Sequence, residues 1–311
     1  MVARITRILL LLQLLVVLTL YALAARIWHW NDGAALAFGV AMVLLLRLGI
    51  TANNFFLAAH YRAPLPSAFR LDGRGKLRLF WQEFGATMLC SSWSMPFRRF
   101  HQRPAAAARG LPVLLVHGYG CNSGYWDAMS RALTQAGITH HALDLEPAFG
   151  SIEDYVPALH DAIRTLCAAS GQDRVVLLAH SMGGLAARAY LRVHGAAHIA
   201  KILTLGTPHH GTALANFGVG VNTQEMGWIG CAGQGQPSSW LHTLTGSENP
   251  ESYRLFVSIY SHHDNIISPP SSSRLEGAKN IELGGIGHVA LALDARVQAL
   301  VIEEILAASR S

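Results

Sequence analysis

The sequence predicts an α/β fold with a mainly parallel sheet flanked by helices, preceded by an N-terminal transmembrane helical hairpin. From Leu111 onward, short apolar runs alternate with longer amphipathic runs, a pattern typical of strand–helix–strand units around a parallel sheet. Before that point, two long apolar runs follow one another near the N-terminus. Hydrophobic residues make up 51% of the 311 residues and charged residues 14%, a composition shifted toward that of membrane proteins.

Residues 1–62 are predicted to form a membrane anchor with helices at about 8–25 and 33–52. The first run, ILLLLQLLVVLTLYALAA, is uncharged and about long enough to cross a bilayer. The second run spans if Arg47 extends its guanidinium toward the lipid head groups. A cleaved signal peptide is the alternative, because the segment Ala22–Ala24 imitates a cleavage site. The length of the first run and the presence of the second favour an uncleaved helix.

The distribution of positive charge predicts on which side of the membrane the main domain lies. Lys and Arg near a span tend to remain on the cytoplasmic side. The connection Arg26–Asp32 carries one cation and one acid, whereas further cations gather before the first span and beyond the second. We therefore expect a bacterial-type inner (plasma) membrane protein whose main domain is cytoplasmic. If only the first run spans, that domain lies on the periplasmic side.

Residues 63–110 mix basic and aromatic side chains and are predicted to be a linker, with an interfacial helix and a flexible end. Their cations contribute to the net charge of +5 but lie beside the apolar region, not on a recognisable nucleic-acid-binding motif. We therefore expect a bilayer, and no nucleic acid, as a partner. The sequence indicates no particular protein partner.

The cysteines show neither a CxxC pair nor the spacing of a zinc site, so we expect free thiols rather than disulfides or metal ligands. They are Cys90, Cys121, Cys167 and Cys231.

The main α/β domain is predicted at 111–311. Its expected strands are 113–116, 139–143, 174–178, 202–205, 254–260 and 280–283. Its expected helices are 125–136, 152–169, 182–193 and 290–308.

The run RVVLLAHSMGGLAARAYL places Ser181 where a buried strand passes into a helix. A serine on such a tight turn projects its hydroxyl above the edge of the sheet. Small residues are needed two positions before and two after it, because larger ones meet the crossing backbone. Ala179 and Gly183 meet this requirement. Taken alone, the motif fits a helix-capping serine equally well.

A nucleophilic serine requires a base, and an acid that orients the base. Asp264 follows the run RLFVSIYS and His288 follows NIELGG, so both come at the carboxyl ends of predicted strands. The order serine, acid, histidine is the one used with this strand–turn–helix arrangement. His262 and His263 compete with His288 but lack its glycine-rich setting. The HHD triplet suggests a metal, but no further ligands occur at matching spacing, and no metal is expected.

The stretch LLVHGYGCNSGYW has two interpretations. A glycine-rich turn after a strand, with Asp144 downstream, resembles a dinucleotide-binding loop, but the third glycine of that motif is replaced by Ser123. A tetrahedral oxyanion instead needs two backbone N–H donors. Met182, directly after the nucleophile, and Tyr119, between two glycines, are positioned to supply them. The second interpretation is favoured, and an NAD-dependent enzyme becomes remote.

Together, VLLVHGYG, AHSMGG, TLGTPHHGT, the Asp264 segment and GIGHVAL resemble the α/β-hydrolase superfamily, specifically its bacterial lipase and esterase branch (triacylglycerol lipase-like). The resemblance covers about Pro112–Ser311 and includes small lipases whose nucleophile motif opens with alanine. It implies an α/β-hydrolase fold. The catalytic and oxyanion residues that it implies are Ser181, Asp264, His288, Tyr119 and Met182.

Two further segments are interpreted through this resemblance. TPHHGT matches a segment that these lipases place near the pocket, so His209 and His210 are expected to shape the site without transferring protons. The glycine-rich stretch 213–245 is poorly periodic and contains apolar residues such as Met226 and Trp240. It is expected to form a lid or acyl-chain wall, or else a cap whose aromatic residues pack on the core.

The sequence therefore predicts a membrane-anchored serine hydrolase that cleaves lipid or other acyl esters through an acyl-enzyme, with no cofactor. An amidase, a thioesterase or an acyltransferase uses the same triad and remains an alternative. A non-catalytic membrane scaffold of hydrolase fold is the other alternative, and the intact triad argues against it. The anchor departs from the secreted members of the lipase branch.

Overall fold

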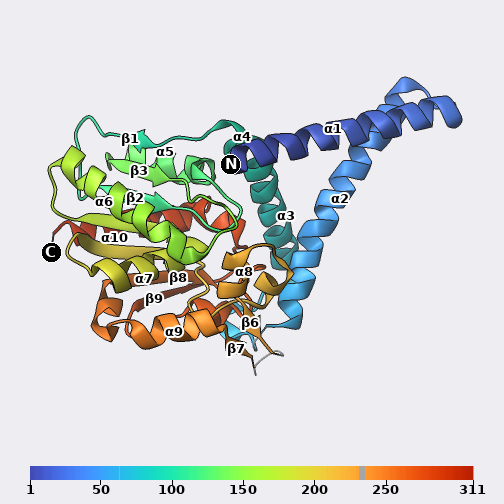
Figure 1. The fold of residues 1–311 in the computed structure, drawn as a ribbon. Helices are drawn as coiled ribbons and strands as arrows, with labels where there is room; N and C mark the ends of the chain where they lie inside the picture. The colour runs from blue at the N-terminus through green and yellow to red at the C-terminus, as the bar shows by residue number, and fades with distance from the viewer. Residues whose placement is uncertain (63, 231–234, 311) are drawn as a thin grey trace.

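One large sheet organises the main domain of the chain. The computed structural model describes residues 1–62, 64–230 and 235–310. In these residues seven strands form the sheet, in the order β1-β3-β2-β4-β5-β8-β9, and all neighbouring pairs except β1 and β3 are parallel (Figure 1). The strands are β1 Gln102–Arg103, β2 Val113–Val116, β3 His140–Leu143, β4 Val175–His180, β5 Ile199–Leu205, β8 Phe256–Ser261 and β9 Lys279–Leu283. A separate antiparallel pair consists of β6 Trp228–Ile229 and β7 Gln236–Pro237.

The central strands are buried on both faces, as the continuous apolar runs of the sequence require. In β4, Val176 and Leu178 pack into one core cluster, whereas Val175 and Leu177 pack into another on the opposite face. The first cluster contains residues of α5 and α10, and the second contains residues of α6 and α7. Helices therefore cover both faces and leave the carboxyl edge of the sheet to loops.

The helices of the main domain connect and cover these strands. They are α5 Asp127–Gln135, α6 Val156–Ser170, α7 Met182–His194, α8 Val221–Glu225, α9 Ser239–Ser247 and α10 Ala295–Ala308.

All the expected strands occur; β2 has the expected ends, and the others differ by one to three residues at one or both ends. β4 continues to His180, directly before Ser181, and β5 begins at Ile199, three residues earlier than expected. The helix expected at 290–308 is divided into a 3₁₀ turn, Val289–Ala292, and α10. The division occurs because the Asp294 carboxylate caps a new helix by accepting the N–H of Arg296 at 2.9 Å.

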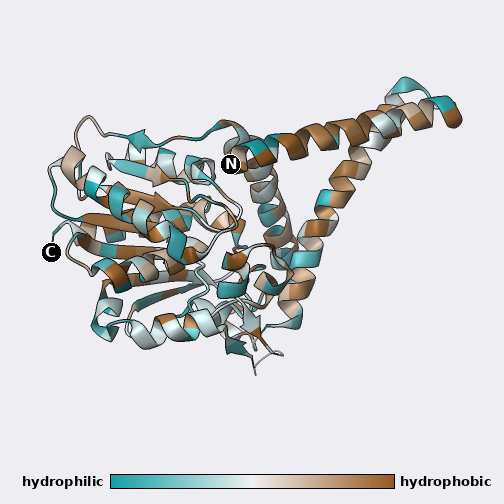
Figure 2. Ribbon diagram, viewed as in Figure 1, coloured by the Kyte–Doolittle hydropathy of each residue, from teal (hydrophilic) through white to brown (hydrophobic). Residues whose placement is uncertain are grey.

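The two N-terminal apolar runs form α1, Val2–Ile27, and α2, Asp32–His60, which extend away from the main domain as an antiparallel pair (Figure 1). Both are long and apolar enough to cross a membrane (Figure 2). Only 6% of the most apolar 18 residues of α1, and 11% of those of α2, are buried in the structure. Gly39 permits their close approach, because a Cβ atom there would lie 2.6 Å from the carbonyl oxygen of Val17.

Arg47 turns inward between the helices, which differs from the expected extension toward the head groups. Its Nε donates to Gln13 of α1 at 2.9 Å, and its guanidinium also donates to Ser91 and Ser92 at 3.2 and 2.7 Å. Polar acceptors on two neighbouring segments thus satisfy the cation locally. A single apolar run does not reveal that these acceptors lie beside Arg47.

The segment expected as a linker is largely helical and packs against the main domain. It contains α3, Gly73–Leu89, a π-helical turn, Cys90–Ser94, and α4, Met95–Phe97. α3 lies between α2 and the main domain (Figure 1), with Glu83 buried on its inner face. Residue 63, the first of the expected linker, lies outside the described residues.

Candidate active site

Ser181 occupies the turn between β4 and α7, in a backbone conformation that few residues adopt. Its φ is 55°, a left-handed value with a strain of about 1–3 kcal/mol for a residue with a side chain. Small neighbours permit the turn. A Cβ on Gly183 would lie 2.6 Å from the carbonyl oxygens of Val116 and His117, and one on Gly184 would meet Thr207. The turn therefore depends on residues without side chains at these positions.

Asp264 and His288 are joined directly, although they follow different strands. The Nδ1–H of His288 donates to Asp264 Oδ2 at 2.7 Å, and both residues are buried. The other oxygen of Asp264 accepts the backbone N–H groups of Ile266 and Ile267 at 2.8 and 2.7 Å. These bonds hold the carboxylate in place. Because the carboxylate keeps the proton of His288 on Nδ1, Nε2 is left as the basic nitrogen.

Opposing effects act on the pKa of His288. Burial lowers this pKa, but the charge of Asp264 and its hydrogen bond, with a further contribution from Glu83, raise it by more. The result is a pKa above the ordinary value for histidine. The imidazolium form is thus stabilised inside the fold, which is what a base that must accept a proton requires.

Glu83, which the sequence analysis did not identify, supports the loop that carries His288. Its carboxylate on α3 accepts the backbone N–H groups of Val289 and Ala290, both at 3.0 Å. Burial raises the pKa of Glu83, and these two hydrogen bonds offset the increase only in part. A Cβ on Gly287 would lie 2.4 Å from the same carboxylate, so the loop backbone passes close to Glu83.

His180 provides a second support for His288. Its Nε2–H donates to the carbonyl oxygen of His288 at 3.1 Å, and its ring packs against the rings of His288 and Tyr125, with centroids 4.5 Å away in each case. Burial, with the neighbouring His288, holds the pKa of His180 well below its ordinary value. The ring is therefore neutral and acts as a hydrogen-bond donor rather than as a base. In the sequence, only the position of His180 directly before Ser181 indicates that it lies at the site.

The loop after β2 approaches Ser181 closely. A Cβ on Gly118 would lie 2.7 Å from the Cβ of Ser181, so glycine is required there. His117 fastens this loop to the end of β3, because its Nε2 accepts the N–H of Leu145 at 2.9 Å while its Nδ1–H donates to the Gly118 carbonyl. Among the described residues, the backbone N–H of Tyr119 has no acceptor, and neither has that of Met182.

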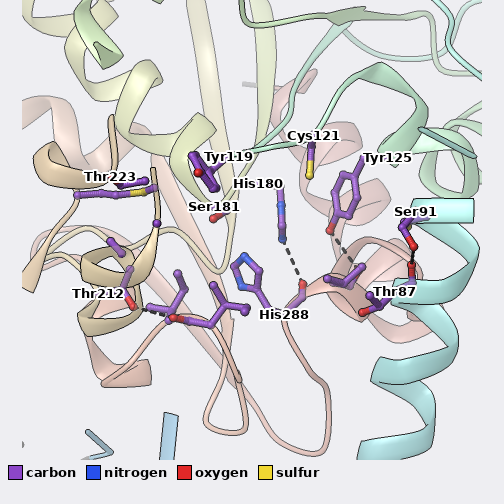
Figure 3. Close-up of a pocket in the computed structure, with 18 of the residues that line it drawn as sticks. Thr87, Ser91, Tyr119, Cys121, Tyr125, His180, Ser181, Thr212, Thr223 and His288 are labelled. Atoms are coloured by element: carbon purple, nitrogen blue, oxygen red, sulfur yellow. Dashed lines mark hydrogen bonds between the residues drawn. The ribbon is translucent and has the colours of Figure 1, made fainter. Parts of the chain in front are cut away.

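A cavity of about 240 Å³ lies above this edge of the sheet, and Ser181 and His288 both line it (Figure 3). Tyr119 lines it as well. The remaining lining is largely apolar and includes Met95, Cys121, Tyr125, Met226, Ile267 and Val289. Within the described structure, no hydrogen bond joins the Ser181 hydroxyl to the His288 ring. Such bonds often tighten only when substrate is bound.

The stretch 213–245 contributes one wall of this cavity, through Gly218, Thr223 and Met226. The hydroxyl of Tyr119 ties that wall to the loop after β2, because it donates to the carbonyl oxygen of Val219 at 2.8 Å and accepts the N–H of the same residue at 3.1 Å. Residues 231–234, within the expected lid, lie outside the described residues.

Trp240 of α9 packs at the periphery of the core and donates to Glu153 at 3.0 Å. It does not line the cavity. The stretch 213–245 thus contributes both a wall of the cavity and an aromatic residue packed on the core.

His209 and His210 do not line the cavity, which differs from the expected role of the TPHHGT segment. His209 is fully buried, and its carbonyl oxygen accepts a hydrogen bond from Arg188 at 2.7 Å. Arg188 is itself buried and paired with Glu248 at 2.5 Å. Thr207 of this segment donates to the carbonyl oxygen of Ser181 at 2.9 Å, which stabilises the turn at Ser181.

The competing residues of the sequence analysis have other partners. His262 pairs with Glu282 at 2.9 Å, and His263 accepts the N–H of Gly285 at 3.0 Å. Asp144 accepts the N–H of Ser123 at 2.6 Å. These contacts position loops, and none of the three residues lines the cavity.

The described cysteines are free, and two of them line the cavity. Burial raises the pKa of both Cys90 and Cys121 to about 12, so they are neutral thiols at physiological pH. Cys231 lies outside the described residues. In the part of the chain that the structure describes, no cluster of three or more His, Cys, Asp or Glu residues is arranged to hold a metal ion.

Curated proteins with similar sequences include bacterial lipases. Over 122 residues, which is 36% of this chain, the sequence is 31% identical to a triacylglycerol lipase of Pseudarthrobacter phenanthrenivorans and to one of Burkholderia plantarii. The matched stretch spans 37% and 33% of those proteins, about a third of the length of each. A probable esterase of rice, PIR7A from Oryza sativa, is also 31% identical over 122 residues, 35% of this chain and 45% of that protein.

Solved structures of lipases share the fold of the main domain. The mature form of the Bacillus licheniformis lipase BlEst2 superposes with a TM-score of 0.55 at 20% identity, over 67% of this chain and 97% of the lipase. Aspergillus fumigatus lipase B gives a TM-score of 0.53 at 18% identity, over 65% of this chain and 53% of that protein.

A family model matches the same region of the chain. Residues 113–266 match the model of the alpha/beta hydrolase family. This stretch contains β2, the turn at Ser181 and the loop of Asp264. The predicted fold class is therefore confirmed, and the predicted resemblance to the α/β-hydrolase family is confirmed over residues 113–266.

Proposed function

We propose that this protein is a serine hydrolase that cleaves carboxylic esters through a Ser181–His288–Asp264 triad. The observation that carries this proposal is the position of Ser181. It occupies a left-handed turn at the end of β4 and shares a cavity with a histidine that is already paired with a buried carboxylate. A serine that only caps a helix does not require a left-handed conformation, and the Ser181 side chain forms no capping hydrogen bond in α7. Both observations argue against the helix-capping interpretation.

In the proposed acylation step, the Ser181 oxygen forms a bond to the ester carbonyl carbon while His288 Nε2 takes the hydroxyl proton. Asp264 keeps the proton of Nδ1 in place and stabilises the imidazolium. The tetrahedral intermediate then collapses. Its bond to the alcohol oxygen breaks, and His288 returns the proton to the departing alcohol. Water repeats the sequence on the acyl-enzyme and releases the carboxylic acid and free Ser181.

The backbone N–H groups of Tyr119 and Met182 are the proposed donors to the oxyanion. Both have no other acceptor among the described residues. Gly118 permits the loop that carries Tyr119 to approach Ser181. Donors of this kind contribute about 2.7–4 kcal/mol each to the stability of the transition state in well-studied hydrolases.

An acyl ester of a lipid is the proposed substrate class. The lining of the cavity is largely apolar, which suits the hydrocarbon of an acyl chain. α1 and α2 are proposed to anchor the enzyme in a bacterial-type inner membrane, with the main domain on the cytoplasmic side. A site held at a bilayer meets lipids far more often than one free in solution.

Labelling with a fluorophosphonate probe tests the nucleophile. Detergent-solubilised wild-type protein is expected to be labelled, whereas Ser181→Ala and His288→Ala are not. Ser239→Ala and His198→Ala change an exposed serine and an exposed histidine elsewhere, and both should be labelled as wild type. Absence of labelling in folded wild-type protein contradicts the proposal.

An ester series of increasing acyl length then tests the substrate class. We expect release of acyl chains from lipid vesicles as well as from long-chain esters in detergent. Activity confined to short water-soluble esters, with none toward lipid vesicles, would exclude the lipid substrate while leaving the triad intact.

A further inference from the structure

A second cavity, separate from the one containing Ser181, lies where the N-terminal helices meet the main domain. Its volume is about 520 Å³, more than twice that of the catalytic cavity. Its walls come from the last turns of α2, from residues 65–71, from the first half of α3 and from His263. It shares no lining residue with the catalytic cavity.

The polar lining of this second cavity consists of hydrogen-bond donors. Arg62, Arg70 and Lys76 line it, and no described lining residue is acidic. His263 adds a fourth donor. Its Nδ1 accepts the N–H of Gly285, so the proton of the neutral ring lies on Nε2. Burial, with Arg62 next in effect, lowers the pKa of His263 to about 4, which keeps the ring neutral at physiological pH.

The cations of this cavity lack direct ion-pair partners among the described residues, although the charge of Asp264 acts on Arg62 from beyond ion-pair distance. Neither Arg62, Arg70 nor Lys76 forms an ion pair with any described residue. The Nε of Arg62 is also buried without a hydrogen-bond partner. Burying such a donor unpaired is costly, and an anionic acceptor in the cavity removes that cost.

The other half of the cavity is apolar. Phe55 and Ala59 of α2 and Leu79 and Phe80 of α3 face it, and the rings of Phe55 and Phe80 lie 5.9 Å apart. A ligand that fills both halves carries an anionic group and hydrocarbon. The cavity also lies at the end of the apolar helix α2, next to the cations that follow it. If α2 spans a bilayer, this end of the helix lies at the depth of the lipid phosphates.

We propose that this cavity binds the phosphate head group of an anionic membrane lipid, with the phosphate between Arg62, Lys76 and His263. The start of the lipid's hydrocarbon then lies against Phe55 and Phe80. This site is independent of the proposed ester hydrolysis, because the lipid is bound and not cleaved there.

Equilibrium binding of ether-linked lipids to the detergent-solubilised full chain tests the site, since ethers cannot be hydrolysed at Ser181. We expect saturable binding of a dialkyl phosphatidic acid and at least tenfold weaker binding of the matching phosphatidylcholine. The Arg62→Gln/Lys76→Gln variant should bind the phosphatidic acid about tenfold or more weakly than wild type. Lys76→Gln alone, at an exposed position, provides the same comparison if the double variant does not fold.

The matched control is Arg74→Gln/Arg78→Gln, which removes two exposed cations of the same helix that do not line the cavity. Its affinity should remain within about twofold of wild type. Equal losses in both variants would overturn the proposal, because general attraction between charges would then explain the binding. Inorganic phosphate bound as tightly as the lipid would overturn the assignment to a lipid.

Discussion

The carboxylate of Glu83 on α3 accepts the backbone N–H of Val289, 206 positions later in the chain, at 3.0 Å. Val289 directly follows the proposed base, so a helix of the N-terminal region holds the loop on which catalysis is proposed to depend. α3 also lines the catalytic cavity through Thr87. The N-terminal region and the main domain therefore build the site together, and removing residues up to 110 would remove part of it.

Replacement of Glu83 tests this support. Glu83→Ala leaves two buried N–H groups without an acceptor, and we expect it to lower the free energy of unfolding by about 2–4 kcal/mol. Glu83→Gln keeps one acceptor oxygen and should recover part of that stability. Chemical denaturation measures both. A loss below about 0.5 kcal/mol for Glu83→Ala would contradict a supporting role.

The charge of Glu83 is expected to affect the pH profile as well. Because this charge raises the pKa of His288, Glu83→Gln should move the acidic limb of the kcat/KM profile to lower pH. Glu303→Gln, which removes an exposed acid of α10, is the control and should leave the limb in place. An unchanged acidic limb in both variants would mean that Glu83 acts through its hydrogen bonds and packing, without an effect of its charge on His288.

Asp264→Asn tests the acid of the proposed triad. Wild-type activity requires neutral His288, so it should fall as the pH decreases through a pKa above the ordinary histidine value. In Asp264→Asn the raising effect of the carboxylate is lost while burial remains, so the residual activity should persist to lower pH. We also expect kcat to fall by about 10⁴-fold, as for the corresponding change in a well-studied serine protease. A profile with an unchanged acidic limb would exclude Asp264 as the acid.

Gly118→Ala tests the close approach of the proposed oxyanion loop to Ser181. The added methyl group would lie 2.7 Å from the Cβ of Ser181, so the loop must move away. We expect kcat/KM to fall by about 10²-fold, because the Tyr119 N–H moves from its position. Gly85→Ala on α3 adds the same methyl group where nothing lies within 4 Å and should leave kcat/KM unchanged.

The buried ion pair of Arg188 and Glu248 predicts a large effect on stability away from the site. Both side chains are almost wholly inaccessible, so Glu248→Ala leaves a buried cation uncompensated and should cost about 3–5 kcal/mol. The exposed pair of Arg254 and Glu251 is the control, and Glu251→Ala should cost less than about 1 kcal/mol. Equal losses in thermal or chemical denaturation would contradict the role assigned to burial.

The sequence by itself determined the features that depend on neighbouring residues. The apolar run of β4 and the small residues around Ser181 predict the strand, the turn and the nucleophile, because backbone geometry limits which side chains fit there. The order of Ser181, Asp264 and His288 at successive strand ends also placed them at one edge of the sheet. The structure brings Asp264 and His288 into contact as that order predicts.

Only the tertiary structure decided which distant residues meet. Glu83 has the local signature of a surface acid on an amphipathic helix, and nothing near it in the sequence indicates the N–H groups that it accepts. Arg62, Lys76 and His263 lie on three separate segments and form one cavity only after α2 and α3 pack against the loop of Asp264. Periodicity and turn chemistry are properties of adjacent residues, whereas burial and the pairing of charges follow from how the elements pack.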